Sequence, residues 1–159
     1  MKLFKNIKKW LENQEHLFYL FLLILIVPNI ILCFTEPMPV VAKVCNVLLP
    51  FAFYYLLMTL SRNCGKMFWI LFLFIFFGAF QIVLLYLFGQ SIIAVDMFLN
   101  LVTTNSSEAM ELLDNLVPAL VSVIILYIPA LILAVISIIK KRKLSPEFIR
   151  RERKKAWIA

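Results

Sequence analysis

Four stretches of the chain contain no charged residue over a length that could cross a lipid bilayer. The hydrocarbon core of a membrane is about 30 Å thick, and a helix of about 20 residues crosses it. Soluble domains contain about 25% charged residues, whereas this chain contains 16% charged and 64% hydrophobic residues. Continuous apolar runs and only three Gly also exclude a lipid-facing β-barrel. The sequence therefore predicts an all-α, polytopic membrane bundle with four transmembrane helices, which correspond to Leu17–Thr35, Val44–Ser61, Met67–Val95 and Asn115–Ile139.

The third uncharged stretch is too long for a single span. Its 29 residues would form a helix of about 43 Å. Asp96, which follows it, would cost about 3 kcal/mol at the bilayer centre. We therefore expect the third helix to end near Gly89 and the chain to continue from Ser91 along the membrane interface.

The distribution of Lys and Arg predicts the orientation of the four spans. Loops on the cytoplasmic side of a membrane carry an excess of these residues. The loops Glu36–Lys43 and Gly89–Asn115 are poor in them, and the second contains four acids and no base. We therefore expect residues 89–115 in the periplasm and both termini in the cytoplasm of a cell with the chain in its inner membrane. The net charge of +7 then reflects topology, and no nucleic-acid partner is predicted. The basic residues that this orientation places on the cytoplasmic side are Lys2, Lys5, Lys8, Lys9, Arg62, Lys66 and nine residues from Lys140 to Lys155.

The chain divides into three segments on this basis. Residues 1–15 are predicted to form a cytoplasmic amphipathic helix at the interface, because apolar residues recur at helical spacing between the lysines. Residues 16–139 form the four-span domain, including the periplasmic loop 89–115. Residues 140–159 form a basic cytoplasmic tail. A stop-transfer anchor is the favoured interpretation of this tail, with binding to anionic headgroups as the alternative.

The predicted spans contain few groups that could perform chemistry. Asn29, Asn46 and Gln81 are most simply partners in hydrogen bonds between helices. Cys33 and Cys45 lie near the outer face, and both are best interpreted as small apolar residues. No combination of His, Cys and carboxylates suggests a nucleophile or a zinc site. We therefore predict no catalytic residue and no metal ligand in this chain.

The periplasmic loop is the most informative segment for function. Its first half, Ile92–Val102, is apolar and is predicted to form a helix in the outer interface. A second helix is predicted to begin at Asn105, with Glu108 as the reciprocal partner of a capping box. The loop is therefore expected to consist of a helix, a polar break and a second helix.

Asn100, Thr104 and Glu108 follow one another at intervals of four residues. On a continuous helix they would share one face, and at a break they would converge. A carboxylate and two neutral polar groups could bind a zwitterionic lipid headgroup, with Glu108 on the ammonium and the other two on phosphate or glycerol oxygens. Spacing alone favours the alternative that these residues only cap and break helices.

This segment resembles the outer-loop signature of the bacterial phosphoethanolamine transferases, a group that includes lipid A modifiers and the mobile colistin-resistance enzymes. The four-span pattern, with this loop between the third and fourth spans, is similar to the N-terminal membrane domain of that family across the whole chain. The residues that carry the resemblance have the order M-x-x-N-x-x-x-T-x-x-x-E and are Met97, Asn100, Thr104 and Glu108, followed by Leu112, Leu113 and Asn115.

The resemblance implies a function for the loop. Members of the family transfer phosphoethanolamine from phosphatidylethanolamine to lipid A or a related acceptor at the outer face of the inner membrane. A threonine nucleophile and zinc perform the reaction in a soluble α/β domain. The residues that match Asn100, Thr104 and Glu108 help to hold the lipid donor. The resemblance therefore favours headgroup binding over capping for these three residues.

The chain also departs from the family pattern. The family has a fifth span followed by the catalytic domain, whereas this sequence stops after four predicted spans. We expect it to be a membrane domain that is inactive by itself, with zinc bound only in the missing catalytic domain. The alternative is a non-catalytic, four-helix accessory or scaffold protein of the inner membrane.

Overall fold

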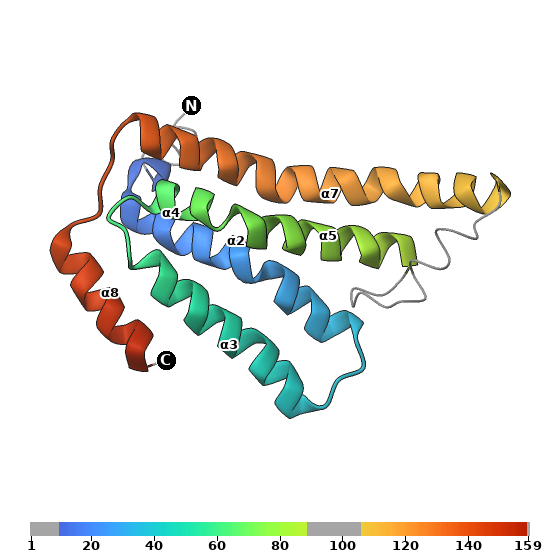
Figure 1. The fold of residues 1–159 in the computed structure, drawn as a ribbon, viewed down its shortest axis with the longest axis horizontal. Coiled ribbons are helices and arrows are strands. Elements are labelled where there is room, and N and C mark those ends of the chain that lie inside the picture. Colours follow the sequence, from blue (N-terminus) through green and yellow to red (C-terminus); the bar gives the residue numbers. More distant parts are fainter. Residues whose placement is uncertain (1–9, 89–105, 159) are drawn as a thin grey trace.

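The computed structural model describes residues 10–88 and 106–158, with side chains for residues 10–85 and 116–157. This part of the chain is helical and contains no strand, so the predicted all-α class is confirmed for it. Figure 1 shows the helices packed side by side along one long axis, with the last helix at one end. The helices are α2 (Gln14–Thr35), α3 (Val40–Met58), α4 (Cys64–Ile70), α5 (Phe72–Phe88), α7 (Ser106–Ile139) and α8 (Pro146–Ile158).

Three of these helices are long and apolar enough to cross a membrane. They are α2, α3 and the part of α7 from Leu116 to Ile139. A fourth span exists if α4 and α5 cross together, although they are bent by 62° relative to each other. The protein is therefore membrane-embedded through three or four spans, and the predicted number of four requires the bent pair.

The first two helices begin earlier than their uncharged stretches. Helix α2 begins at Gln14, because the backbone N–H of Glu15 donates to the Asn13 side chain at 2.9 Å and caps the helix. Gln14 and Glu15, which we assigned to the N-terminal arm, thus belong to α2. Helix α3 begins at Val40 and includes Lys43 in its first turn. The first nine residues lie outside the described part of the chain, so most of the predicted interfacial helix is not tested.

The helix expected for the third span is broken at Leu71, and no such break was predicted from the sequence. No Pro or Gly lies at the break, and the bend accompanies close packing of α4 on α7. A Cβ atom on Gly65 would lie 2.4 Å from the backbone oxygen of Ala134, so only Gly permits this approach of the two backbones. The following helix, α5, is described as far as Phe88, so the predicted helix end near Gly89 is not tested.

Helix α7 is one continuous helix of 34 residues. The second loop helix expected from Asn105 and the fourth span expected from Asn115 therefore lie on a single element. The intervening Glu, Ala, Met and Leu residues favour helix, and the first Pro of α7 is Pro118. After Ile139, Lys141 adopts a positive φ of 49°, and the Arg142 N–H donates to the Ser137 oxygen at 3.1 Å. This left-handed C-terminal turn directs the chain back toward the bundle.

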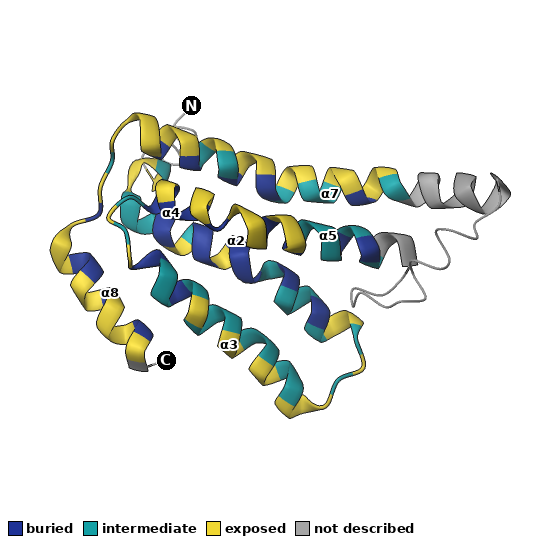
Figure 2. Cartoon of the chain, viewed as in Figure 1, coloured by how far each residue is buried: buried dark blue, intermediate teal, exposed yellow. Residues whose placement is uncertain are grey.

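The buried core is concentrated at one end of the bundle, which we call the basic end. Here α2 begins, α3 is followed by α4, and α7 ends, so Arg62, Lys66 and Lys140–Lys143 gather at this end (Figure 1). The rings of Phe21 and Phe68 stack at 4.4 Å in this core. Figure 2 shows that most of the outward faces of the helices are exposed. Exposed apolar side chains are expected where lipid is the solvent. Toward the other end, α2 and α3 diverge from α5 and α7 (Figure 1).

Candidate functional site

The three residues predicted to bind a headgroup are only partly described. Asn100 and Thr104 lie outside the described residues. Glu108 lies in the first turn of α7, where the structure describes the backbone. The structure therefore assigns Glu108 to a helix and does not test whether the three side chains meet.

Helix α7 relates Glu108 to the membrane-spanning part of the molecule. Glu108 precedes Asn115, where the uncharged stretch begins, by seven residues on the same helix. At 1.5 Å per residue this is about 10 Å along the helix axis. The first turn of α7 lies at the end of the bundle opposite the basic end (Figure 1). Glu108 is thus held outside the apolar span by a continuous helix.

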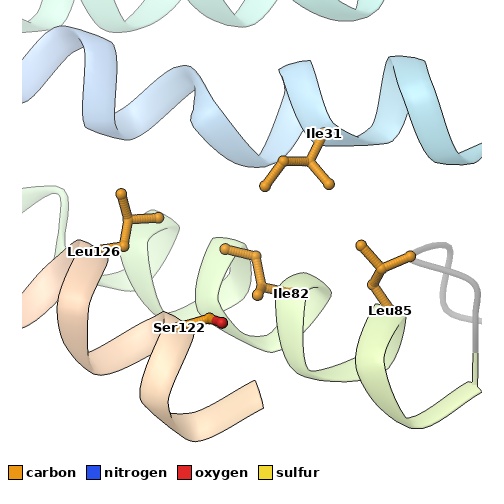
Figure 3. A pocket seen from close by; sticks show the side chains of 5 residues that line it. All are labelled: Ile31, Ile82, Leu85, Ser122 and Leu126. Carbon is orange, nitrogen blue, oxygen red and sulfur yellow. The ribbon is translucent and has the colours of Figure 1, made fainter. Parts of the chain in front are cut away.

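A cavity of about 500 Å³ lies between α2, α5 and α7. Four of the side chains that line it are aliphatic, and the fifth is Ser122, whose hydroxyl donates to the Pro118 oxygen at 2.9 Å. Its volume lies in the usual range of ligand pockets, which is about 300–1,000 Å³. An apolar cavity in a bilayer accommodates hydrocarbon better than water. Figure 3 shows the five lining residues, which are Ile31, Ile82, Leu85, Ser122 and Leu126.

The C-terminal segment contains a site that the sequence analysis missed. Residues from Pro146 form helix α8, which packs against α2 and α3 at the basic end. The ring of Phe148 contacts Phe18 edge-on, with the centroids 5.5 Å apart, and Tyr19 at 6.0 Å. The buried side chains on one side of this segment are Leu144, Phe148, Ile149, Glu152 and Ala156.

Glu152 is the charged residue on the buried face of α8. Its side chain is fully buried, and its Oε2 accepts a hydrogen bond of 2.5 Å from the Tyr55 hydroxyl of α3. The other oxygen, Oε1, accepts from Arg151 Nε and Lys155 Nζ, each at 2.9 Å. A second link between α8 and the end of α3 is the bond from Arg153 Nη2 to the Thr59 backbone oxygen at 2.7 Å.

The surroundings of Glu152 keep it ionised. Burial of the carboxyl raises its pKa, but hydrogen bonds from Tyr55, Lys155 and Arg151 outweigh burial and lower the pKa from 4.5 to about 2. Both carboxylate oxygens are occupied by donors from the protein. This arrangement is suited to attaching α8 to the bundle and leaves no free oxygen for a substrate.

Two signals in the sequence could have revealed α8. Ser145, Pro146 and Glu147 form a typical helix start, and the Phe148 N–H donates to Ser145 Oγ at 3.1 Å. Apolar residues also recur at helical spacing behind this start. The density of basic residues led us to interpret the segment as a tail.

Polar residues within the spans join helices, as the sequence predicted for Asn29 and Asn46. Asn46 Nδ2 donates to the Asn29 backbone oxygen at 2.8 Å, and Asn29 Nδ2 donates to Asn46 Oδ1 at 3.2 Å. At the basic end, Gln14 Oε1 accepts from Ser137 Oγ at 2.7 Å and from Cys64 Sγ at 3.3 Å. These bonds connect α2 with α3 and α2 with α4 and α7, so they have a structural explanation.

Among the residues that the structure describes, no three His, Cys, Asp or Glu side chains are grouped closely enough to hold a metal ion. Comparison with known proteins adds no assignment, because no family model, curated protein or solved structure matches the chain significantly.

Proposed function

We propose that this chain is the membrane domain of a bacterial phosphoethanolamine transferase and that Asn100, Thr104 and Glu108 help to bind the headgroup of the phosphatidylethanolamine donor. In this proposal the phosphoethanolamine passes to lipid A or a related envelope acceptor, and a separate catalytic domain with zinc performs the transfer. The observation that carries the proposal is the signature from Met97 to Glu108, which leads directly into the helix that forms a membrane span.

The place of Glu108 on α7 is consistent with contact to an ammonium group. The ammonium of phosphatidylethanolamine is the outermost group of the lipid, on the water side of its phosphate. A carboxylate on the helix beyond the apolar span lies on the water side of the hydrocarbon core, as the ammonium does. A bond between an ammonium and a carboxylate is charge-assisted and therefore stronger than a neutral hydrogen bond. The cavity between α2, α5 and α7 offers a neighbouring apolar volume for an acyl chain.

The charge distribution supports an orientation for this domain. The basic end combines the link between α3 and α4, the end of α7 and helix α8, and such ends face the cytoplasm by the positive-inside rule. We therefore propose a multi-pass protein of the inner membrane with both termini in the cytoplasm. The first turn of α7 is then on the periplasmic side, where the donor headgroup would be bound.

Competition between lipids for the purified chain tests this function. The delipidated chain is incubated with equal amounts of phosphatidylethanolamine and phosphatidylglycerol, and the retained lipids are counted by native mass spectrometry. We expect phosphatidylethanolamine to be enriched on the wild type and Glu108→Gln to reduce the enrichment by about tenfold, since it removes one charge-assisted bond. Asp114→Asn is the matched control, because residue 114 is about 120° away on the helix.

Two results would contradict the proposal. One is equal retention of the two lipids by the wild type, and the other is an enrichment that Glu108→Gln leaves unchanged. Either result, obtained with helical content equal to that of the wild type, would favour the alternative of a non-catalytic accessory or scaffold protein.

A further inference from the structure

The whole net charge of the protein resides in its last twenty residues. Nine basic and two acidic residues lie between Lys140 and Ala159, which gives this segment a net charge of +7, equal to that of the complete chain. One of the two acids is Glu152, which is fully buried against the bundle. The surface that this segment presents outward is therefore more strongly basic than its composition alone indicates.

The cations of α8 divide into two groups. Arg151 and Lys155 are bound to Glu152, as described above. Arg150 and Lys154 are exposed, and among the described residues no carboxylate lies within ion-pair distance of either. Trp157 at the end of the helix is 75% exposed.

Arg150, Lys154 and Trp157 form one continuous stripe, which we call the outer stripe. Their spacing of four and then three residues puts them within about 60° of one another around the helix. The buried residues Phe148, Glu152 and Ala156 lie on the opposite side. The bundle thus holds the apolar side of α8 and directs two unpaired cations and an indole outward.

Helix α8 lies beside α3 at the basic end. Figure 1 shows it at a steep angle to α5 and α7 and slanted in roughly the same direction as α3. Arg153 bonds to the backbone oxygen of Thr59, and the next residue, Leu60, is 60% exposed. An exposed apolar side chain therefore adjoins the basic helix just after the end of α3.

We propose that the outer stripe of α8 binds the anionic phospholipid leaflet at the basic end of the bundle. Arg150 and Lys154 contact headgroup phosphates, and Trp157 lies at headgroup level, where indole rings are enriched. Clusters of Lys and Arg beside a membrane span are attracted to anionic lipids. The geometry favours a membrane over a soluble acidic partner, because the bundle fixes α8 beside the lipid-facing surface of α3. This inference does not depend on the proposed transferase function.

Quenching of Trp157 fluorescence by brominated lipids tests the proposal. The full chain, with Trp10→Phe and Trp69→Phe, is reconstituted in phosphatidylcholine vesicles that contain phosphatidylglycerol. Either the phosphatidylglycerol or an equal amount of the phosphatidylcholine is brominated. We expect brominated phosphatidylglycerol to quench Trp157 at least about twofold more strongly than brominated phosphatidylcholine does. This quenching ratio should fall at high salt, which screens exposed charges.

Matched variants distinguish the outer stripe from general positive charge. The double variant Arg150→Gln, Lys154→Gln should bring the quenching ratio close to one. The double variant Lys140→Gln, Lys141→Gln loses the same charge outside α8 and should retain most of the preference for quenching by phosphatidylglycerol. The exchange Arg150→Lys with Lys154→Arg preserves charge and should retain the preference. Equal quenching by the two lipids in the wild type, or no quenching by either, would overturn the proposal. A preference that survives the loss of Arg150 and Lys154 would do the same.

Discussion

Glu152 is the residue that most directly attaches α8 to the bundle. It receives one hydrogen bond from α3, through Tyr55, and two from cations of its own helix. A buried charge is costly unless it is fully paired, and removing one member of a buried pair is strongly destabilising. The ionised state of Glu152 and the docked position of α8 therefore depend on each other.

Acidification should release α8 as Glu152 becomes protonated. The pKa of Glu152 is lowered from 4.5 to about 2 in the folded protein. Because the pKa of the acid is lower in the docked state, ionisation stabilises docking at every pH above the ordinary pKa. This stabilisation is lost as the pH falls from about 4.5 to about 2. Release of α8 can be measured with spin labels at Leu49→Cys in α3 and Lys154→Cys in α8, in a chain whose native cysteines are replaced. The distribution of distances between the two labels should broaden as the pH falls through this range.

Two variants control for acidification of other carboxylates. Glu152→Gln resembles the protonated acid, so its distance distribution should already be broad at pH 7 and should change little on acidification. Glu147→Gln, at an exposed position in the first turn of α8, should behave like the wild type. A distribution in Glu152→Gln that stays narrow at pH 7 would show that the carboxylate does not hold the helix.

At the scale of elements, the short helix α4 is defined by its contact with α7. The close approach at Gly65 places backbone against backbone. Asn63, which caps α4, also donates through its Nδ2 to the backbone oxygen of Arg142, in the turn that follows α7, at 3.1 Å. Small residues at helix contacts are typical of membrane proteins, where van der Waals packing and hydrogen bonds hold helices together. The bend at Leu71 separates this docked segment from α5. Since no Pro or Gly lies there, we attribute the bend to tertiary contacts and not to a local helix breaker.

Gly65→Ala should destabilise the bundle more than Gly78→Ala. The new Cβ at position 65 would lie 2.4 Å from a backbone oxygen, whereas the nearest atoms at position 78 are side-chain atoms of Pro28 and Tyr127 at 2.8 Å. Overpacking of this kind costs about 1–3 kcal/mol, which corresponds to a Tm lower by about 3–10 °C for a chain of this size. At position 78 the higher helix propensity of Ala, worth about 1 kcal/mol, offsets the crowding. Thermal unfolding of both variants in one detergent gives the comparison, and equal Tm values would disprove the close contact of α4 with α7.

At the scale of the whole molecule, the described helices form an asymmetric bundle. The basic end contains the large buried aromatic residues and the docked helix α8, whereas the helices diverge toward the other end and border the apolar cavity (Figures 1 and 2). The two ends of the bundle therefore differ in packing and in charge, and residues at each end can be used to test the proposed orientation.

Cysteine accessibility tests that orientation in intact cells. A membrane-impermeant maleimide should label Glu36→Cys, in the link between α2 and α3, and should not label Glu147→Cys in α8 until the membrane is permeabilised. The native cysteines are replaced by Ser in both variants to remove their background. The physical reason is that the basic end is retained in the cytoplasm by the positive-inside rule. Labelling of Glu147→Cys before permeabilisation would reverse the proposed topology.

The sequence by itself determined the class of the protein, the approximate location of its spans and the basic residues beside them. The free energy of transferring a helix into a bilayer is close to a sum of contributions from its residues. Continuous uncharged runs therefore predict α2, α3 and the span of α7 without knowledge of the helices that pack beside them. The pair Asn29 and Asn46 was predicted for a similar reason, since polar side chains within spans need partners.

Only the tertiary structure decided the bend at Leu71 and the docking of α8. These features depend on contacts between residues that are distant in the chain, such as the close approach of Gly65 to Ala134 and the bond between Tyr55 and Glu152, which are 97 residues apart. A basic run has the same composition whether it is an extended tail or a docked helix. The difference arises from a buried carboxylate whose hydrogen bond from Tyr55 exists only when α8 lies against the folded bundle.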